Sequence, residues 1–131
     1  FYAGWVAPHV FGNVGCMSTA FFWNTGDVLD VVRSYTGPVK PVRYWIDAGN
    51  RDGDDLDGNG VAWYYEYAYD MTIRLMEIGW SYGDDLVLHL DMNGIHDTVS
   101  WGPRIAKPLQ YFLVHPRQRL QISLQFHLFL C

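Results

Sequence analysis

The sequence predicts a single α/β domain in which a mostly parallel sheet is flanked by helices. Short segments rich in β-branched and aromatic residues alternate along the chain with longer segments of helical periodicity. Strands that are separated by helices form parallel crossovers rather than hairpins. The chain has 131 residues, of which 50% are hydrophobic and 17% aromatic. This is enough for one hydrophobic core and too little for two comfortable ones.

The first part of the chain contains two predicted strands and one predicted helix. Residues 13–18, NVGCMS, have the apolar character of a short buried strand. Residues 27–35 are expected to form a helix, with Asp27 at or near its N-terminal cap. The Gly and Pro residues of segment 37–41 then break the chain. Residues 42–47, VRYWID, are β-branched and aromatic, which predicts a second strand.

The middle of the chain contains the longest predicted helix and a third strand. Residues 61–78 carry apolar side chains on most turns, and Gly79 supplies a stop signal. Residues 85–91, DLVLHLD, read as a strand, which is followed by the turn residues Asn93 and Gly94.

The end of the chain contains a last helix and a tail of different character. Asp97 is expected to cap a helix over residues 98–114, which Pro108 either kinks or truly begins. Beyond it, apolar and polar residues alternate with period two, as in a strand with one solvated face. We therefore expect a domain over residues 1–114 and an atypical tail over residues 115–131, which is either non-native or an extra strand.

Composition and charge argue against several classes of protein. The net charge is −5 and the nine Lys and Arg residues form no basic stripe, so we expect no nucleic-acid partner. No apolar run has the length of a membrane span and no targeting segment is recognisable, so we expect no membrane partner. The chain starts with Phe rather than Met, and residue 1 is treated as an arbitrary start. Cys16 and Cys131 lack metal or disulfide spacing, and Cys16 is expected to be a buried thiol.

Two loops that follow predicted strands carry ionisable side chains. In open α/β sheets, functional residues gather beyond the carboxyl ends of the strands. The loop after residues 85–91 contains His96. The loop after residues 42–47 contains Asp47, Asp52, Asp54, Asp55 and Asp57. An acid that precedes a histidine on neighbouring strand ends matches the last two members of an α/β-hydrolase catalytic triad. The alternatives are a solvated turn carboxylate and a structural histidine.

Several stretches between residues 1 and 114 resemble the C-terminal half of the esterase D-like family of the α/β-hydrolase fold. WIDAGNRDGDD is a strand that ends in Gly-x-x-Asp, MEIGW closes the next helix, and LHLDMNGIHDTVSW leads into another helix. The opening FYAGWVAPHVFGNVGCMSTAFFW is similar to the family segment just after the nucleophile. There, a residue such as His9 or Pro8 precedes Phe11-Gly12, and a strand ends in Ser followed by aromatic residues.

This resemblance implies a serine carboxylic-ester hydrolase. In such an enzyme Asp52 would be the triad acid and His96 the general base, and Trp101 would flank the histidine loop as packing or as a pocket wall. The implied substrate is a small-molecule or carbohydrate-linked ester, and no cofactor is required.

The sequence departs from the family at the nucleophile. The serine of this fold lies in a Gly-x-Ser-x-Gly pentapeptide, and none occurs here. The closest segment is CMSTA around Ser18, with Cys16 and Ala20 at the glycine positions, but Ser18 aligns better with the strand after the nucleophile. We therefore expect the nucleophile to lie upstream of Phe1. The chain alone should then be inactive, and it should self-associate through an exposed sheet edge.

The acidic loop also fits the calcium-loop template D-x-[DN]-x-[DN]-G-x5-E. The oxygen ligands of a structural calcium ion would come from Asp55, Asp57, Asn59, the Val61 carbonyl and Glu66. The alternative interpretation is a solvated loop in which Asp57 or Asn59 caps the long helix.

Three functions follow from these observations. The first is an esterase fragment that carries the acid and the histidine of a triad. The second is a non-catalytic module of the same α/β fold that is stabilised by calcium or binds carbohydrate. The third is a small complete hydrolase that uses Ser18 as its nucleophile.

Overall fold

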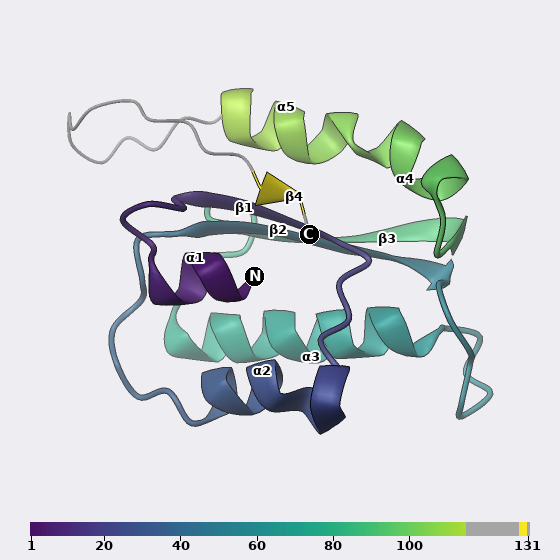
Figure 1. Cartoon of the computed structure of the whole chain (residues 1–131), viewed down its shortest axis with the longest axis horizontal. Helices are drawn as coiled ribbons and strands as arrows, with labels where there is room; N and C mark the ends of the chain where they lie inside the picture. The colour runs from purple at the N-terminus through teal and green to yellow at the C-terminus, as the bar shows by residue number, and fades with distance from the viewer. Residues whose placement is uncertain (115–128, 131) are drawn as a thin grey trace.

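Three parallel strands form the centre of the computed structural model, which describes residues 1–114 and 129–130 (Figure 1). They are β1 (Asn13–Met17), β2 (Arg43–Arg51) and β3 (Leu86–Ile95). A two-residue strand, β4 (Phe129–Leu130), pairs with β1, so the sheet order is β3-β2-β1-β4 and every pairing is parallel. The predicted α/β arrangement with a parallel sheet is confirmed.

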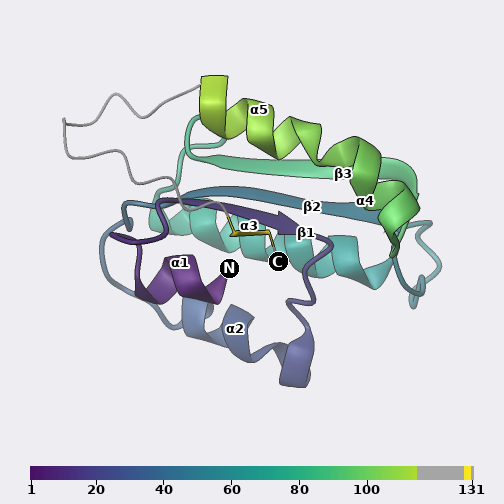
Figure 2. The same cartoon turned by 45° about the horizontal axis from the view of Figure 1, so that its top comes forward.

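Helices cover both faces of the sheet (Figures 1 and 2). On one face lie α1 (Tyr2–Val6), α2 (Trp23–Arg33) and α3 (Trp63–Ile78), and on the other lie α4 (Thr98–Arg104) and α5 (Ala106–Val114). Because both faces are covered, β2 is buried along most of its length, as central strands of parallel sheets are.

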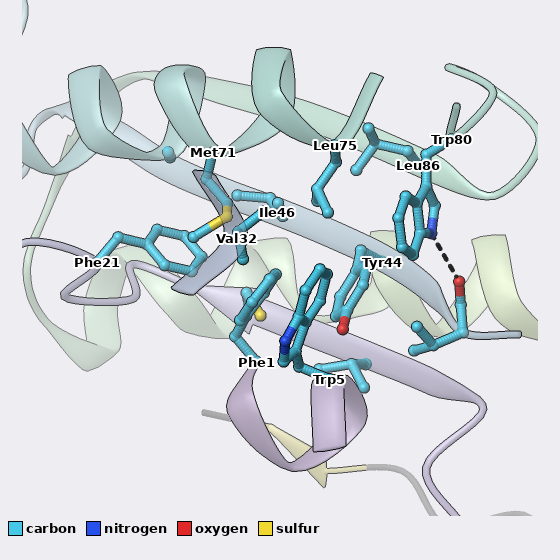
Figure 3. Packing of buried hydrophobic residues seen from close by; sticks show 14 of the residues in the cluster. Phe1, Trp5, Phe21, Val32, Tyr44, Ile46, Met71, Leu75, Trp80 and Leu86 are labelled. Carbon is cyan, nitrogen blue, oxygen red and sulfur yellow. Dashed lines mark hydrogen bonds between the residues drawn. The ribbon is translucent and has the colours of Figure 1, made fainter. Parts of the chain in front are cut away.

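The main hydrophobic core lies between the sheet and the helices α1, α2 and α3 (Figure 3). Tyr44 and Ile46 of β2 meet Met71 and Leu75 of α3, and all four side chains are fully buried. The indole of Trp80 closes one end of this core, where its Nε1 donates a hydrogen bond of 2.9 Å to the carbonyl of Val42.

A smaller core lies on the opposite face of the sheet, where Trp45 of β2 packs against Tyr111 and Phe112 of α5. Arg43 is buried in the same layer, and its guanidinium lies 4.4 Å from the centre of the Tyr111 ring. This layer holds α5 against the sheet and so fixes the chain that leads into it from β3.

Two strands are longer than predicted, because residues that were expected to form turns continue the backbone pairing between β2 and β3. β2 runs to Arg51 and β3 runs to Ile95, and these two residues pair after a register shift. At this register shift, a Cβ on Gly49 would overlap the carbonyl of Gly94. The two backbones therefore lie so close that only glycine fits at position 49. The turn predicted at Asn93 and Gly94 is therefore part of β3.

The long helix α3 ends where predicted and begins two residues later. Gly79 follows it with φ 122°, and its N–H bonds to the carbonyls of Leu75 and Met76. The predicted cap by Asp57 or Asn59 is wrong, because the N-cap is the buried Ala62 and no side chain caps it.

Two other predicted helices differ in their bounds. The helix predicted over residues 27–35 spans Trp23–Arg33, with non-helical dihedrals at residues 24–26, so its regular part begins near Asp27, whose side chain does not cap it. The single helix predicted over residues 98–114 is two helices that meet at Ile105. Pro108 is the third residue of the second one, where its missing N–H has no helical partner to lose.

The remaining predictions concern the ends of the chain and its cysteines. The alternating segment of the tail lies within residues 115–128, outside the described residues, whereas β4 near its end is a strand. Cys16 is fully buried, as predicted. Within the described part of the chain, no helix is long and apolar enough to cross a membrane.

Candidate functional site

Asp52 and His96 meet at the carboxyl ends of two neighbouring strands. Asp52 follows β2 directly and His96 follows β3 directly, and the two strands pair in parallel. The Nδ1 atom of His96 lies 2.7 Å from Oδ1 of Asp52, which is hydrogen-bond distance. The Asp52 side chain is 0% exposed and that of His96 is 41% exposed. A buried carboxylate therefore holds one nitrogen of an imidazole that remains accessible.

The loop around Asp52 is fixed by two backbone features. The second carboxylate oxygen of Asp52 accepts the N–H of Gly49 at 3.3 Å, and the Asp52 N–H returns a bond of 3.2 Å to the Gly49 carbonyl. Gly53 has φ +95°, and a Cβ there would overlap the indole of Trp63 at the start of α3. Contacts with β2 and with the start of α3 thus fix the conformation of this short turn and orient the Asp52 carboxylate toward His96.

The imidazole of His96 is held between two aromatic rings. The ring of Tyr64 lies 4.5 Å from it and that of Trp101 lies 5.0 Å away in an edge-to-face arrangement. Asp97 caps α4 as predicted, because its carboxylate accepts the N–H of Ser100 at 3.0 Å. With Nδ1 on Asp52, Nε2 is the nitrogen left for proton exchange, and no hydrogen bond to it occurs within the described residues.

A cavity of about 440 Å³ opens beside His96. It is bounded by Met17 and Ser18 at the end of β1, by His96, and by Thr98, Trp101, Gly102 and Ile105 in and just after α4. The imidazole therefore borders a space large enough for a small molecule.

Ser18, the candidate nucleophile, lies at the end of β1 in the same cavity. It is 4% exposed and has φ 49°, an uncommon backbone conformation for a residue other than glycine. Its Oγ accepts hydrogen bonds from Trp101 Nε1 at 3.0 Å and from the guanidinium of Arg104 at 2.9 Å. Within the described residues, no hydrogen bond joins Ser18 to His96, and Trp101 contacts both of them.

A buried ionic cluster beneath the cavity was not expected from the sequence. The Arg104 side chain is 3% exposed and lies 3.6 Å from a carboxylate oxygen of Asp47 and 3.5 Å from one of Asp91. Burial raises the pKa of Asp47, while a hydrogen bond from Trp45 and the charge of Arg104 oppose the increase. Arg104 thus connects the end of β1 with the middle of β2 and of β3, since Ser18 follows β1 and Asp47 and Asp91 lie within β2 and β3.

One signal for this cluster exists in the sequence. Asp47 ends a segment that is mostly β-branched and aromatic, and a carboxylate buried in such a strand needs a cationic or hydrogen-bonding partner. Nothing in the sequence around Arg104 marks it as that partner.

The residues of the calcium template converge in the loop before α3. The Asp55 carboxylate accepts the N–H groups of Gly58, Asn59 and Gly60 at 2.8, 3.1 and 2.8 Å. The Asn59 amide donates to Asp57 and, at 2.8 Å, to Glu66 on the first turn of α3. Within the described ranges, however, no three His, Cys, Asp or Glu side chains are grouped closely enough to hold a metal ion.

The fold and the site define an α/β protein in which a buried carboxylate orients an accessible imidazole at the rim of a cavity. Comparisons with protein-family models, with curated proteins and with solved structures gave no match. The chemistry of the site is therefore the feature that indicates function.

Proposed function

We propose that this chain carries the acid and the general base of a serine carboxylic-ester hydrolase, with Asp52 and His96 in these roles. The observation that carries the proposal is the 2.7 Å contact between a fully buried carboxylate and an imidazole that borders a cavity. In a catalytic triad, the acid fixes the tautomer and orientation of the histidine, and the histidine accepts the proton of the attacking serine.

The chemistry assigned to these two residues follows from their contacts. Asp52 accepts the Nδ1 proton of His96, so Nε2 is available to take a proton from a hydroxyl nucleophile. As the proton arrives, the imidazolium is stabilised by the adjacent carboxylate. The same nitrogen then returns the proton to the departing alcohol, and an acyl-enzyme remains to be hydrolysed by water.

The nucleophile of the proposed site is not assigned to Ser18. Its Oγ already accepts two hydrogen bonds, and the indole that supplies one of them also packs on His96. We propose instead that the nucleophilic serine belongs to a strand that would pair with the outer edge of β1. That strand would come from residues that precede Phe1 or from another polypeptide, and a Gly-x-Ser-x-Gly pentapeptide is expected in it.

The experiment compares the chain alone with an extended form, in which the chain is joined to the polypeptide proposed to carry the Gly-x-Ser-x-Gly strand. Enzymatic hydrolysis of p-nitrophenyl acetate is expected only in the extended form. The chain alone should increase the rate of hydrolysis no more than free imidazole at the same concentration does. In the extended form, His96→Gln and Asp52→Asn should each lower kcat by roughly 10⁴-fold, as loss of a triad member does.

Two results would contradict this proposal. One is an extended protein whose hydrolysis is unaffected by His96→Gln. The other is efficient hydrolysis by the chain alone that disappears in Ser18→Ala, which would make Ser18 the nucleophile. His9→Gln is the matched control, because His9 is exposed on the segment between α1 and β1.

A second candidate function is a non-catalytic α/β module stabilised by calcium. Its support is the closeness of Asp55, Asp57, Asn59 and Glu66, four residues of the calcium template, which hydrogen bonds join around the start of α3. Binding of a glycan without hydrolysis of any ester, in a protein whose melting depends on calcium, would favour this module over the esterase.

A further inference from the structure

We infer that the cavity beside His96 selects an ester with a compact, uncharged apolar group, such as a single aromatic ring or a short aliphatic chain. This inference rests on the proposed function, because it names the substrate class of the same site. It depends on the composition of the walls, on their rigidity and on the size of the cavity.

The walls of the cavity offer an apolar group contacts and offer a charged group no partner. Met17, Trp101 and Ile105 supply apolar surface from β1 and α4. Among the described residues, no side chain with a fixed charge lines the space, and His96 is the one titratable group in the lining. A carboxylate or ammonium entering it would lose its water without gaining an ion pair, which is strongly unfavourable.

The hydroxyl of Ser18, a polar group in the cavity wall, is already engaged by the protein. The Oγ atom of Ser18 accepts from both Trp101 and Arg104, so two of its bonding positions are used by the protein. The guanidinium of Arg104 is buried and does not itself line the cavity; it lies near Asp47 and Asp91, and its contact with the lining is the hydrogen bond to Ser18. Recognition inside the cavity therefore depends on shape and apolar contact.

The cavity wall is held in place before any ligand arrives. Trp101 is fixed at one end by the hydrogen bond from its Nε1 to Ser18 and along its face by the edge-to-face contact with His96. A wall that is already ordered adds little entropy cost to binding. The volume of about 440 Å³ lies in the lower part of the range of small-molecule sites, roughly 300–1,000 Å³.

The test measures binding to the chain as it exists, so it does not require catalysis. The probes are methyl benzoate, which is uncharged, and the anion of monomethyl terephthalate, which adds a carboxylate to the same ring. The readouts are the NMR signals of the Trp101 indole N–H and the His96 ring during titration. Methyl benzoate should shift both in a saturable manner, and the charged probe should bind at least about tenfold more weakly.

Substitution of the wall provides the structural control. Ile105→Phe should fill part of the cavity and weaken methyl benzoate binding by about tenfold or more. Leu109→Phe is the matched control, because Leu109 is similarly half-buried one turn further along and does not line the cavity. If Ile105→Phe fails to fold, Gly102→Leu replaces it, since a Cβ at Gly102 meets nothing within 4 Å, with Gly12→Leu as the equivalent control.

The outcomes separate this inference from the proposed function. Equal binding of both probes, or equal effects of Ile105→Phe and Leu109→Phe, would overturn the assignment of the cavity even if the extended protein hydrolyses esters through His96. Selective methyl benzoate binding that Ile105→Phe weakens supports the assignment of the cavity, even where no form of the protein hydrolyses an ester.

Discussion

Arg104 is the residue whose environment departs most from what its position in the sequence suggests. Its guanidinium is buried, contacts two carboxylates and donates to Ser18, and these partners come from β2, from β3 and from the residue after β1. An arginine in this position connects the two strands whose ends lead into Asp52 and His96. Its removal should therefore affect stability more than the loss of any exposed ion pair.

The first prediction concerns the stability of an Arg104→Met variant. The substitution leaves the Asp47 carboxylate buried without its cation, which should cost about 3–5 kcal/mol near pH 7. The control Arg33→Met removes two exposed ion pairs, one within α2 and one from α2 to Asp70 of α3, and should cost less than about 1 kcal/mol. Urea unfolding followed by circular dichroism measures both values.

The pH dependence of this loss follows from the Asp47 carboxyl. Burial raises the pKa of Asp47 in the folded state, so the folded state holds the proton to a higher pH than the unfolded state does. Stability then falls as the pH rises from the unfolded pKa through the folded one. Without Arg104 the folded pKa is raised further, so the cost of Arg104→Met should be smaller near pH 5 than near pH 7. A cost that is equal at the two pH values would contradict this account of Asp47.

At the scale of elements, the type and order of the strands could be predicted but their ends could not. β2 and β3 follow from their β-branched and aromatic residues, and their parallel pairing follows from the helix between them. Asn93 even has the positive φ, 73°, that its turn signal suggests. The strand nevertheless continues through it, because Gly49 has no Cβ to block the close approach of the Gly94 backbone, and pairing resumes at Arg51 and Ile95.

In the candidate site, likewise, some contacts could be predicted from the sequence and others could not. The contact of Asp52 with His96 follows from strand adjacency alone, since parallel neighbours end at the same edge of a sheet. The bonds from Trp101 and Arg104 to Ser18 depend on how α4 packs over the strand ends, 83 and 86 residues away along the chain. No periodicity in the sequence reports such a contact between single polar side chains.

The second prediction concerns the loop of residues 55–66. Three backbone N–H groups already hold the Asp55 carboxylate, and the hydrogen bonds lower its pKa. The site is thus ionised, and Glu66 is connected to it through Asn59. If calcium binds with a Kd of about 10⁻⁴–10⁻³ M, about 5 mM calcium should stabilise the fold by roughly 1–2 kcal/mol and raise Tm by several degrees.

Differential scanning fluorimetry with calcium, with magnesium and with chelator measures this effect. Glu66→Gln should abolish the calcium shift, whereas Glu77→Gln, an exposed substitution at the far end of the same helix, should retain it. An unchanged Tm at millimolar calcium, in protein that is folded, would leave the loop stabilised by its own hydrogen bonds alone.

At the scale of the whole molecule, the outer edge of β1 is paired along only part of its length by the described residues. On the outer side of β1, the described residues supply only β4, which pairs with Val14 and Gly15. Cys16 and Met17 continue β1 beyond it, toward the end that carries the candidate site. The adjacent helix α1 also presents Tyr2 and Val6 to solvent, each 55% exposed.

The third prediction is that this side of the molecule pairs with a second copy of the chain. A parallel edge that the described residues pair only in part, next to exposed apolar side chains, is a template for association. Sedimentation velocity should show a shift to dimers or larger species as the concentration rises from about 1 to about 100 µM. Tyr2→Lys should weaken the association because it places a charge beside the edge. Tyr69→Lys is the matched control, since Tyr69 is 50% exposed on α3, away from β1. A monomer over the whole concentration range, or equal weakening of the association by both variants, would show that the edge of β1 does not mediate self-association. The strand proposed to carry the nucleophile would then need another place to pair.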